Sequence, residues 1–245
     1  MKISATKVGT YQKCPKKYQL TYLEGNWEPP SQPATQGRIA HEAIAKGYEH
    51  KLATGKELDI EEKFKHIDLA FEQDQAIGNT NYRDLVEDVV RETKEMVLIH
   101  HDDIAVRTDP FLVEKSFEID VDGVQLVGIW DFVTLDGWIV DNKFFSKTPS
   151  QADLDKDVQM SFYSLAYRLM FNEPEKGIRL DCVIKNKNKK SFQIATNRTT
   201  EELNWVVNLI KETAQAMETG IYPCNPSGWW CSPRFCGVYE QCMYG

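Results

Sequence analysis

The hydrophobic pattern changes its period near the middle of the chain, and this change constrains the fold more than any other feature. Apolar residues recur at helical spacing in the first 100 residues, whereas Phe111 to Phe145 alternates with period two. Asp136-Gly137 interrupts the alternation, and an Asp-Gly pair between two alternating segments is a strong signal for a β-hairpin. We therefore predict strands over residues 111–121, 124–135 and 138–145.

Helices are expected on both sides of these strands, because the flanking apolar residues follow the helical period. Pro15 should interrupt the first helix or begin a new one. The predicted helices are 7–24, 37–50, 61–77, 82–100, 153–171 and 199–220, with further strands at 179–185 and 192–196 and a proline-containing loop at 27–33. This order predicts an α/β fold class with a mixed central sheet flanked by helices.

Length and charge limit the possible classes of protein. The 245 residues are expected to form one domain, with a mainly helical part over 1–100, an α/β core over 111–220 and a cysteine-rich tail over 221–245. No apolar run of about 18 residues exists, and residues 1–18 lack an apolar stretch of signal-peptide length, so we expect a cytoplasmic protein without membrane contact. The net charge of −8 restricts any nucleic-acid site to a local basic patch or a metal-bridged cleft.

Two carboxylates and a lysine on neighbouring predicted strands form the most informative pattern. Asp131 ends the segment Val-Gly-Ile-Trp-Asp, and Asp141 and Lys143 lie on the next strand. Residues two apart on a strand share a face, so Asp141 and Lys143 point the same way. Neighbouring buried carboxylates repel each other unless a cation lies between them. A hard divalent ion would satisfy both carboxylates, and a buried ion pair with Lys143 is the simpler alternative.

The register of this hairpin provides a structural test. A two-residue turn at Asp136-Gly137 would pair Asp131 with Asn142 and place Asp131 and Asp141 on opposite faces of the sheet. A shared metal site therefore predicts an odd-length loop, a β-bulge or a strongly bent strand.

Two residue pairs at helical i, i+4 spacing add polar groups. Gln159 and Tyr163 share one face of the helix that follows the strands. Gly37 and His41 share a face of an earlier helix, where the glycine allows close approach and the imidazole can bind a metal. Taken alone, the first pair could be ordinary polar helix residues, and His41 could be a packed or surface histidine.

The combined order of these motifs resembles the PD-(D/E)xK nuclease superfamily, and in particular its RecB-like branch. That branch includes CRISPR-adaptation nucleases and many phage exonucleases. In chain order the motifs are Cys14-Pro15, Gly37-x3-His41, Glu114, Gly128-x2-Asp131, Asp141-x-Lys143 and Gln159-x3-Tyr163. The resemblance extends from Ser4 to Cys242. It implies a restriction-endonuclease-like core and a metal-dependent DNA nuclease.

The resemblance also implies roles for the matched residues. The metal ligands for Mg²⁺ or Mn²⁺ would be His41, Asp131, Asp141 and the backbone carbonyl of Asn142. Lys143 would activate water and stabilise charge on the phosphate, and Gln159 and Tyr163 would position the phosphate or support the lysine. Glu114 would support the metal ligands without binding the metal itself. Asn142 stands where the branch often has an aromatic residue, but its side chain is expected to face away from the chemistry.

Cysteines concentrate at the end of the chain. Four of the six follow residue 223, and three of these have the spacing Cys231-x4-Cys236-x5-Cys242. The RecB-like branch often binds a 4Fe–4S cluster through one cysteine before the core, here Cys14, and three after it. In that branch the interval between the first two of the three later cysteines is usually shorter than the one between Cys231 and Cys236. Tetrahedral zinc and free thiols remain as alternatives, with Cys224 as a substitute ligand and Cys182 as a core residue. Such a centre would attach the tail to the N-terminal helix.

DNA is the expected partner. The candidate phosphate contacts are Lys16, Lys17, Arg38, Lys187 and Lys189, although each alone could be a solvated surface residue. By analogy with compact phage nucleases, a single-strand annealing or other recombination protein is a further expected partner. The expected function is an exonuclease for recombination, repair or DNA-end processing. The alternative is a catalytically inactive nuclease fold that serves as an iron–sulfur DNA-binding or structural subunit.

Overall fold

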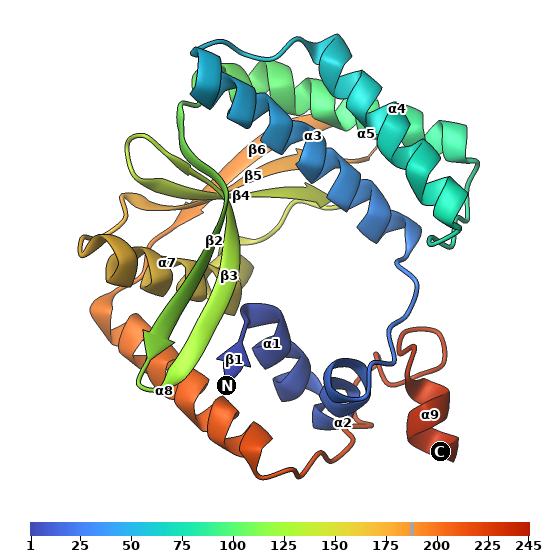
Figure 1. Ribbon diagram of the computed structural model, residues 1–245, viewed down its shortest axis with the longest axis vertical. Coiled ribbons are helices and arrows are strands. Elements are labelled where there is room, and N and C mark those ends of the chain that lie inside the picture. Colours follow the sequence, from blue (N-terminus) through green and yellow to red (C-terminus); the bar gives the residue numbers. More distant parts are fainter. Residues whose placement is uncertain (187–188) are drawn as a thin grey trace.

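A mixed sheet flanked by helices organises the chain, as the sequence predicts (Figure 1). The computed structural model describes residues 1–186 and 189–245. Within these residues the strands are β1 Lys2–Ile3, β2 Pro110–Val121, β3 Val124–Thr134, β4 Trp138–Phe145, β5 Gly177–Ile184 and β6 Lys190–Thr196. The α-helices are α1 Ala5–Lys13, α2 Pro15–Tyr18, α3 Gln32–Thr54, α4 Ile60–Ile77, α5 Val86–Asp103, α6 Gln151–Asp155, α7 Val158–Phe171, α8 Thr200–Glu218 and α9 Tyr239–Tyr244. A π-helix, η1 Gln19–Leu23, and a 3-10 turn, η2 Ala105–Arg107, complete the elements.

The helices form two groups around the sheet. Helices α3, α4 and α5 pack on one another, α3 packs on β2, β3 and β4, and α5 packs on β5 and β6. Helices α1, α7 and α8 pack together, and α7 and α8 contact the β2–β3 ribbon. Trp130, Phe117 and the apolar face of α7 belong to the largest core cluster. No helix in the described part of the chain combines the length and apolar character needed to cross a bilayer.

Several helix boundaries differ from the sequence prediction, among them the end of α3 at Thr54 and the bounds of α5, Val86–Asp103. The predicted helix 153–171 is two helices, because the Asp157 side chain caps the start of α7 by accepting hydrogen bonds from the N–H groups of Gln159 and Met160. Helix α3 begins at Gln32, inside the predicted loop 27–33, because a proline is tolerated in a first helical turn. The first predicted helix breaks at Cys14, which is extended, and α2 begins at Pro15.

The sheet splits along one edge of β3. Strand β1 pairs parallel with the start of β3 at Gln125 and Leu126, and β4 pairs antiparallel with its end at Phe132 and Val133. Strand β2 runs antiparallel along the other edge over the whole length of β3. Figure 1 shows the β2–β3 ribbon bending away from β4, β5 and β6. Asp131 lies where the two parts of the sheet separate.

Next to Asp131, the side chains of β3 switch from one side of the sheet to the other. Trp130 packs in the α7-side core beside Phe117, whereas Phe132, two residues later, packs 4.3 Å from the ring of Tyr48 on α3. Two residues apart on a regular strand would share a face, so β3 twists sharply between them. On β2, opposite this point, Glu114 has the left-handed backbone angle φ 44°. The sharply bent strand predicted from the hairpin register is therefore present.

The motif glycine of β3 has a packing role. A Cβ atom on Gly128 would lie 2.3 Å from the Phe117 ring, much closer than packed carbon atoms approach. The ring pairs across the strands with Gly128 and stacks 4.6 Å from Trp130. The glycine therefore lets an aromatic ring cover the ribbon at this position.

The C-terminal tail docks on the N-terminal helices, as expected. The N–H of Lys16 donates to the carbonyl of Pro223 at 3.2 Å, and Asn225 donates to the carbonyl of Lys13 at 3.0 Å. The Tyr222 ring lies near Tyr11 and Tyr18. Segments more than 200 residues apart in sequence are thereby joined.

The left-handed conformation of Glu114 predicts an unusual order of stability for two variants. A non-glycine residue in this region costs about 1–2 kcal/mol. We expect Glu114→Gly to exceed Glu114→Ala in free energy of unfolding by about 1 kcal/mol, as measured by urea titration. Both variants lose the carboxylate, so their difference isolates the backbone. An alanine variant at least as stable as the glycine variant, which is the usual order in a strand, would contradict the prediction.

Candidate functional site

The β3–β4 hairpin places the two predicted metal-binding carboxylates opposite each other. Phe132 pairs with Val140 and Val133 with Ile139, so the loop after Thr134 contains three residues, 135–137. Continuing this register by one residue places Asp131 opposite Asp141. The odd-length loop predicted from the sequence is thus confirmed, and the two side chains share a face of the hairpin.

The Asp131 carboxylate joins three elements. Its Oδ2 accepts a hydrogen bond from the backbone N–H of Asn142 on β4 at 2.8 Å and lies 3.1 Å from Nδ1 of His41 on α3. Burial would raise the pKa of Asp131, but His41 and the Asn142 N–H outweigh burial and hold it below its usual value. Burial would lower the pKa of His41, but Asp131 raises it overall. The pair therefore favours a carboxylate beside an imidazolium.

Asp141 is the most constrained group of the site. It is 1% exposed, and neither carboxylate oxygen accepts a directed hydrogen bond. Its Oδ2 lies 2.7 Å from Nζ of Lys143, which forms an ion pair without hydrogen-bond geometry. Burial raises the pKa of Asp141 to about 6 despite the nearby lysine charge, and Asp131 adds to the increase. Burial opposes the charge on Lys143, but Asp141 outweighs it and raises the lysine pKa.

Helix α7 brings Gln159 and Tyr163 to this region. The Gln159 side chain donates to the Tyr163 hydroxyl at 2.7 Å, as their i, i+4 spacing predicts. Burial raises the pKa of Tyr163 well above its usual value, and the charges of Asp141 and Asp131 add to this effect. The tyrosine therefore remains protonated, and it lies close enough to both carboxylates to experience their charge.

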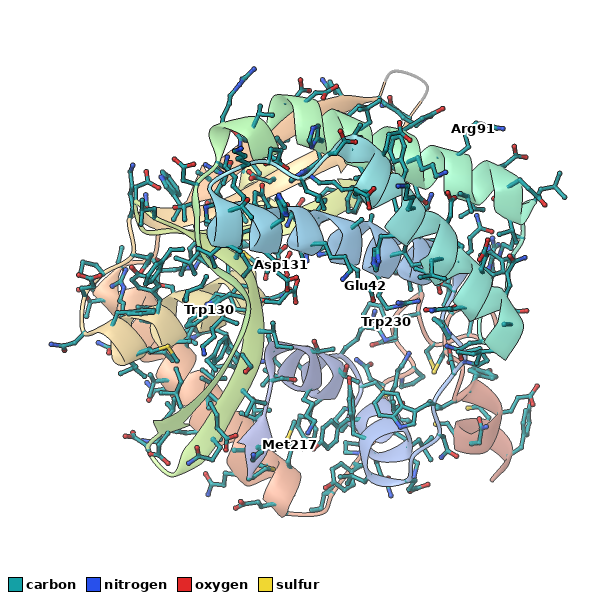
Figure 2. The ribbon with its side chains drawn as sticks, turned by 45° about the horizontal axis from the view of Figure 1, so that its top comes forward. Glu42, Arg91, Trp130, Asp131, Met217 and Trp230 are labelled. Atoms are coloured by element: carbon teal, nitrogen blue, oxygen red, sulfur yellow. The ribbon has the colours of Figure 1, made fainter. Side chains whose placement is uncertain are left out.

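A pocket of about 600 Å³ opens beside Asp131. Figure 2 shows Asp131 on β3 and Glu42 on α3 facing the same opening. Glu114 lines the pocket, where burial and the Asp131 charge raise its pKa to about 7. Glu114, predicted to support the metal ligands, forms part of the pocket wall next to Asp131.

Sequence analysis missed most of the residues in the pocket wall. Besides His41 and Arg38, the wall from α3 and α4 contains Glu42, Lys46, Glu49 and His66. The α3 members recur every three or four residues from Arg38, so helical periodicity marks them as one face. His66 on α4 has no sequence signal.

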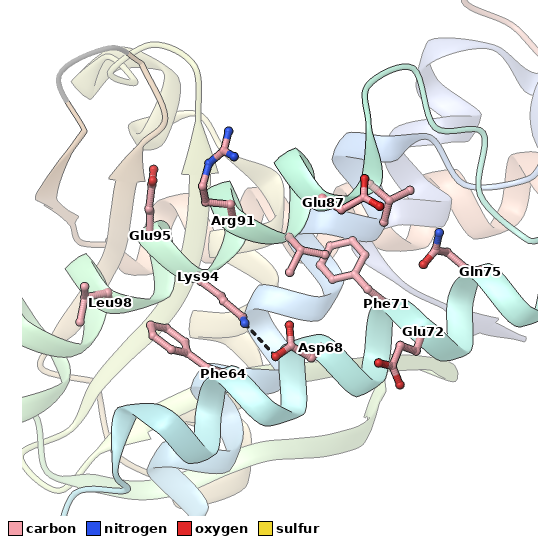
Figure 3. A pocket seen from close by; sticks show the side chains of 12 residues that line it. Phe64, Asp68, Phe71, Glu72, Gln75, Glu87, Arg91, Lys94, Glu95 and Leu98 are labelled. Atoms are coloured by element: carbon pink, nitrogen blue, oxygen red, sulfur yellow. Dashed lines mark hydrogen bonds and ion pairs between the residues drawn. The ribbon is translucent and has the colours of Figure 1, made fainter.

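A second groove of similar size lies between α4 and α5, and neither Asp131 nor Asp141 lines it (Figure 3). It has a volume of about 590 Å³, and apolar residues such as Phe64 and Phe71 line its floor. Its charges are partly paired, since Lys94 donates to Asp68 at 2.7 Å. No residue predicted to be catalytic lines this groove, whereas Asp131, His41 and Glu114 line the pocket beside Asp131.

The donor groups beside the split in the sheet fit a hard divalent cation. Oδ1 of the buried Asp141 carboxylate has no hydrogen-bond partner and Oδ2 is paired with Lys143, so a further cation could still be accommodated at Oδ1. The Asn142 carbonyl should face Asp131, because the N–H and C=O of one strand residue point to the same side. In the described residues, no set of three or more His, Cys, Asp or Glu side chains is arranged to hold a metal ion. Asp131 contacts His41 and Asp141 contacts Lys143 instead, so a cation would exchange these contacts.

Five cysteines line one small cavity in the tail. The cavity of about 30 Å³ is lined by Cys14, Cys224, Cys231, Cys236 and Cys242, together with Trp230. Burial raises the pKa of the Cys231 thiol, and Cys236 and Cys14 add to the increase, which reflects their proximity. Cys182 is buried in β5, as expected of a core residue. None of the six cysteines, all of which lie in the described part of the chain, forms a disulfide bond.

The predicted DNA contacts do not form one patch. Arg38 lies in the pocket wall, where it pairs with Glu42 at 2.7 Å. Lys16 and Lys17 lie on α2 beside the tail, and Lys17 lines the cysteine cavity. Lys189 pairs with Glu95 on α5. Lys187 lies outside the described residues.

Comparisons with known proteins agree with this geometry. The profile of the PD-(D/E)XK nuclease superfamily matches residues 2–243. No match was found among curated proteins. A solved structure from Eubacterium rectale, described as a "putative exonuclease", has a TM-score of 0.63, 11% identity, and coverage of 93% of this chain and 86% of that chain. At this identity the likeness shows the fold alone. The structure of SSO0001 covers 94% of both chains at 10% identity, but its TM-score of 0.35 carries no argument.

The raised pKa of Asp141 predicts that this carboxylate destabilises the metal-free protein at neutral pH. The carboxyl titrates near pH 6 in the folded state and near 3.8 when unfolded, so its contribution to stability falls as pH rises through this window. We expect Asp141→Asn to raise the free energy of unfolding at pH 8 by about 3 kcal/mol, since each pKa unit corresponds to about 1.4 kcal/mol. The gain should shrink toward zero near the unfolded pKa. Urea titrations of both proteins at matched pH, with EDTA, measure this difference; an asparagine variant less stable at pH 8 would refute it.

Proposed function

This chain belongs to the PD-(D/E)XK nuclease superfamily, and from this membership we propose that it is a metal-dependent DNA exonuclease. The proposed reaction is hydrolysis of phosphodiester bonds in DNA-end processing, recombination or repair. One observation carries the proposal: the odd-length β3–β4 loop places Asp131 and Asp141 on one face, with Lys143 beside them. A pocket of about 600 Å³ opens beside Asp131, the member of this group that lines it.

We propose that Asp131, Asp141, the Asn142 carbonyl and His41 bind Mg²⁺ or Mn²⁺. When bound, such an ion polarises a phosphate oxygen and lowers the pKa of water. Carboxylate and carbonyl oxygens suit Mg²⁺, and the imidazole of His41 favours tolerance of Mn²⁺. Oδ1 of the buried Asp141, which has no hydrogen-bond partner, supports this assignment.

The remaining groups are proposed to act on the phosphate directly. Lys143 keeps its proton because Asp141 raises its pKa, so its ammonium group can stabilise the negative charge that develops during in-line attack. Tyr163 also keeps its proton, and its hydroxyl accepts a hydrogen bond from Gln159, which fixes the orientation of both side chains. Gln159 and Tyr163 are therefore proposed to position the phosphate or Lys143.

Arg38 is the basic residue best placed to contact DNA near this site, since it lines the pocket beside His41. The motif order and the cysteine tail support assignment to the RecB-like branch. A single-strand annealing or other recombination protein is the proposed partner, by analogy with compact members of this branch.

We propose that Cys14, Cys231, Cys236 and Cys242 bind a metal centre that attaches the tail to the N-terminal helices. A 4Fe–4S cluster is the proposed occupant, with Zn²⁺ as the alternative. Support comes from the cavity that these thiols line together with Cys224. The tail has few apolar contacts of its own, since α9 has no buried residue, so such a centre would contribute folding energy directly.

Removal of the lysine charge should reduce nuclease activity. We expect Lys143→Met to lower the initial rate by about 10²–10³-fold in Mg²⁺ or Mn²⁺, since a group that stabilises transition-state charge contributes this much. Asp141→Ala should abolish cleavage. The assay is digestion of end-labelled single- and double-stranded DNA. Lys211→Met, which removes one lysine from α8, is the matched control and should retain the wild-type rate; equal activity of Lys143→Met and Lys211→Met would remove Lys143 from the chemistry.

Substrate topology tests the exonuclease assignment separately. An exonuclease needs a DNA end, so closed circular single-stranded DNA should resist cleavage while the linearised molecule is degraded. Equal cleavage of both forms would indicate an endonuclease with the same site.

The cysteine centre predicts a difference between two cysteine variants. Cys236→Ala should lose bound iron or zinc and unfold at lower urea concentration, because the tail loses its attachment. Cys182→Ala removes a thiol buried in β5, whose pKa burial raises to about 12, and should keep the metal content of the wild type. Elemental analysis and visible absorbance of anaerobically purified proteins distinguish cluster from zinc. Wild-type protein without either metal would show that the thiols are free.

A further inference from the structure

We propose that His100 is a positioning residue for the nuclease site: its imidazole holds the side chain of Asn142 and so fixes the segment of β4 whose main chain binds Asp131. The inference rests on the proposed function and extends it to a residue outside the matched motifs. It assigns a task to the middle residue of the Asp-Asn-Lys segment, whose side chain points away from the carboxylates.

The contact is short and fully buried. His100 on α5 is 1% exposed, and its Nε2 lies 2.9 Å from Oδ1 of Asn142, which is 3% exposed. The backbone N–H of the same Asn142 donates to Oδ2 of Asp131 at 2.8 Å. One residue is therefore held from both directions: its side chain by α5, and its main chain by the carboxylate that also contacts His41.

The surroundings of the two ring nitrogens make this contact directional. Nδ1 is buried without a hydrogen-bond partner, whereas Nε2 lies against the side-chain oxygen of Asn142, which can only accept a hydrogen bond. We therefore assign an N–H to Nε2, which donates to Oδ1 of Asn142. The Tyr48 ring packs nearly perpendicular to the imidazole at 6.0 Å and limits its rotation.

Stability alone does not explain why His100 and Asn142 are paired inside the core. Asparagine is disfavoured in strands, and two buried polar groups could be replaced by apolar residues at little cost. Yet the pair lies between Asp141 and Lys143, where a shift of the main chain would move the Asn142 carbonyl and both charged side chains together. Substitution of a residue that orients a metal ligand without touching the metal commonly lowers metal affinity by about 10–100-fold.

The test compares two substitutions that separate the hydrogen bond from the ring. His100→Phe keeps a ring but loses the donor, and His100→Gln keeps an N–H donor. Amide hydrogen exchange of Asn142, followed by NMR on the metal-free protein, reports on the main-chain bond to Asp131. Mn²⁺ affinity, measured by EPR with the ion as the only ligand, reports on the site. Val89→Ala is the stability control, because Val89 is buried on the same helix about 16 Å from His100.

We expect His100→Phe to accelerate exchange of the Asn142 amide and to weaken Mn²⁺ binding about tenfold. His100→Gln should restore most of the amide protection and most of the Mn²⁺ affinity. Val89→Ala should leave both the amide exchange rate and the Mn²⁺ affinity unchanged despite its lower stability. If His100→Phe does not fold, Asn142→Leu removes the same bond from the other side and allows the same two measurements.

Two results separate failure of this inference from failure of the proposed function. An Asn142 amide that exchanges as slowly in His100→Phe as in the wild type would show that His100 is only a core residue. Wild-type protein that binds no Mn²⁺ would overturn the proposed metal site, and the amide exchange would still decide the role of His100.

Discussion

The hydrogen bond from the Asn142 backbone N–H to Oδ2 of Asp131 is the interaction on which the site depends. In a continuous sheet that N–H would bind a carbonyl of the neighbouring strand. Here the strands β3 and β4 separate after only two paired residues, and the carboxylate takes the place of the missing acceptor. An unsatisfied buried N–H would cost about 1–3 kcal/mol, so Asp131 makes the separation possible and is itself held at the resulting opening.

Unfavourable local features concentrate around this opening. Glu114 adopts a left-handed backbone angle, Asp141 is a buried carboxyl whose Oδ1 has no hydrogen-bond partner, and Asn142 is an amide inside a strand. Each of these choices lowers stability on its own. Their occurrence within adjacent strands agrees with the general observation that proteins break local rules at functional sites. The well-packed Phe117–Trp130 core beneath them supplies the rigidity that holds these groups in place.

The sequence predicted the strands and marked Asp131, Asp141 and Lys143 as candidate site residues, because periodicity and motif order are local properties. It could not choose the hairpin register, since Asp136-Gly137 is compatible with a two-residue turn and with the three-residue loop that forms. The position of Glu114 in the pocket wall depends on a backbone angle that no residue type specifies. His100 and His66 carry no pattern at all, because their roles arise from packing between elements distant in the chain.

The site is therefore a property of the whole core. Its groups come from α3, β2, β3, β4 and α7, and the contact with Asn142 adds α5. Because Oδ2 of Asp131 contacts both His41 and the main chain of β4, a shift of the α3–α5 layer changes the imidazole and the strand together. Non-local contacts of this kind form only when the sheet and both helix groups are in place. Changes far from the carboxylates, in the packing between α3 and α5, are then expected to act on the chemistry through the geometry of Asn142.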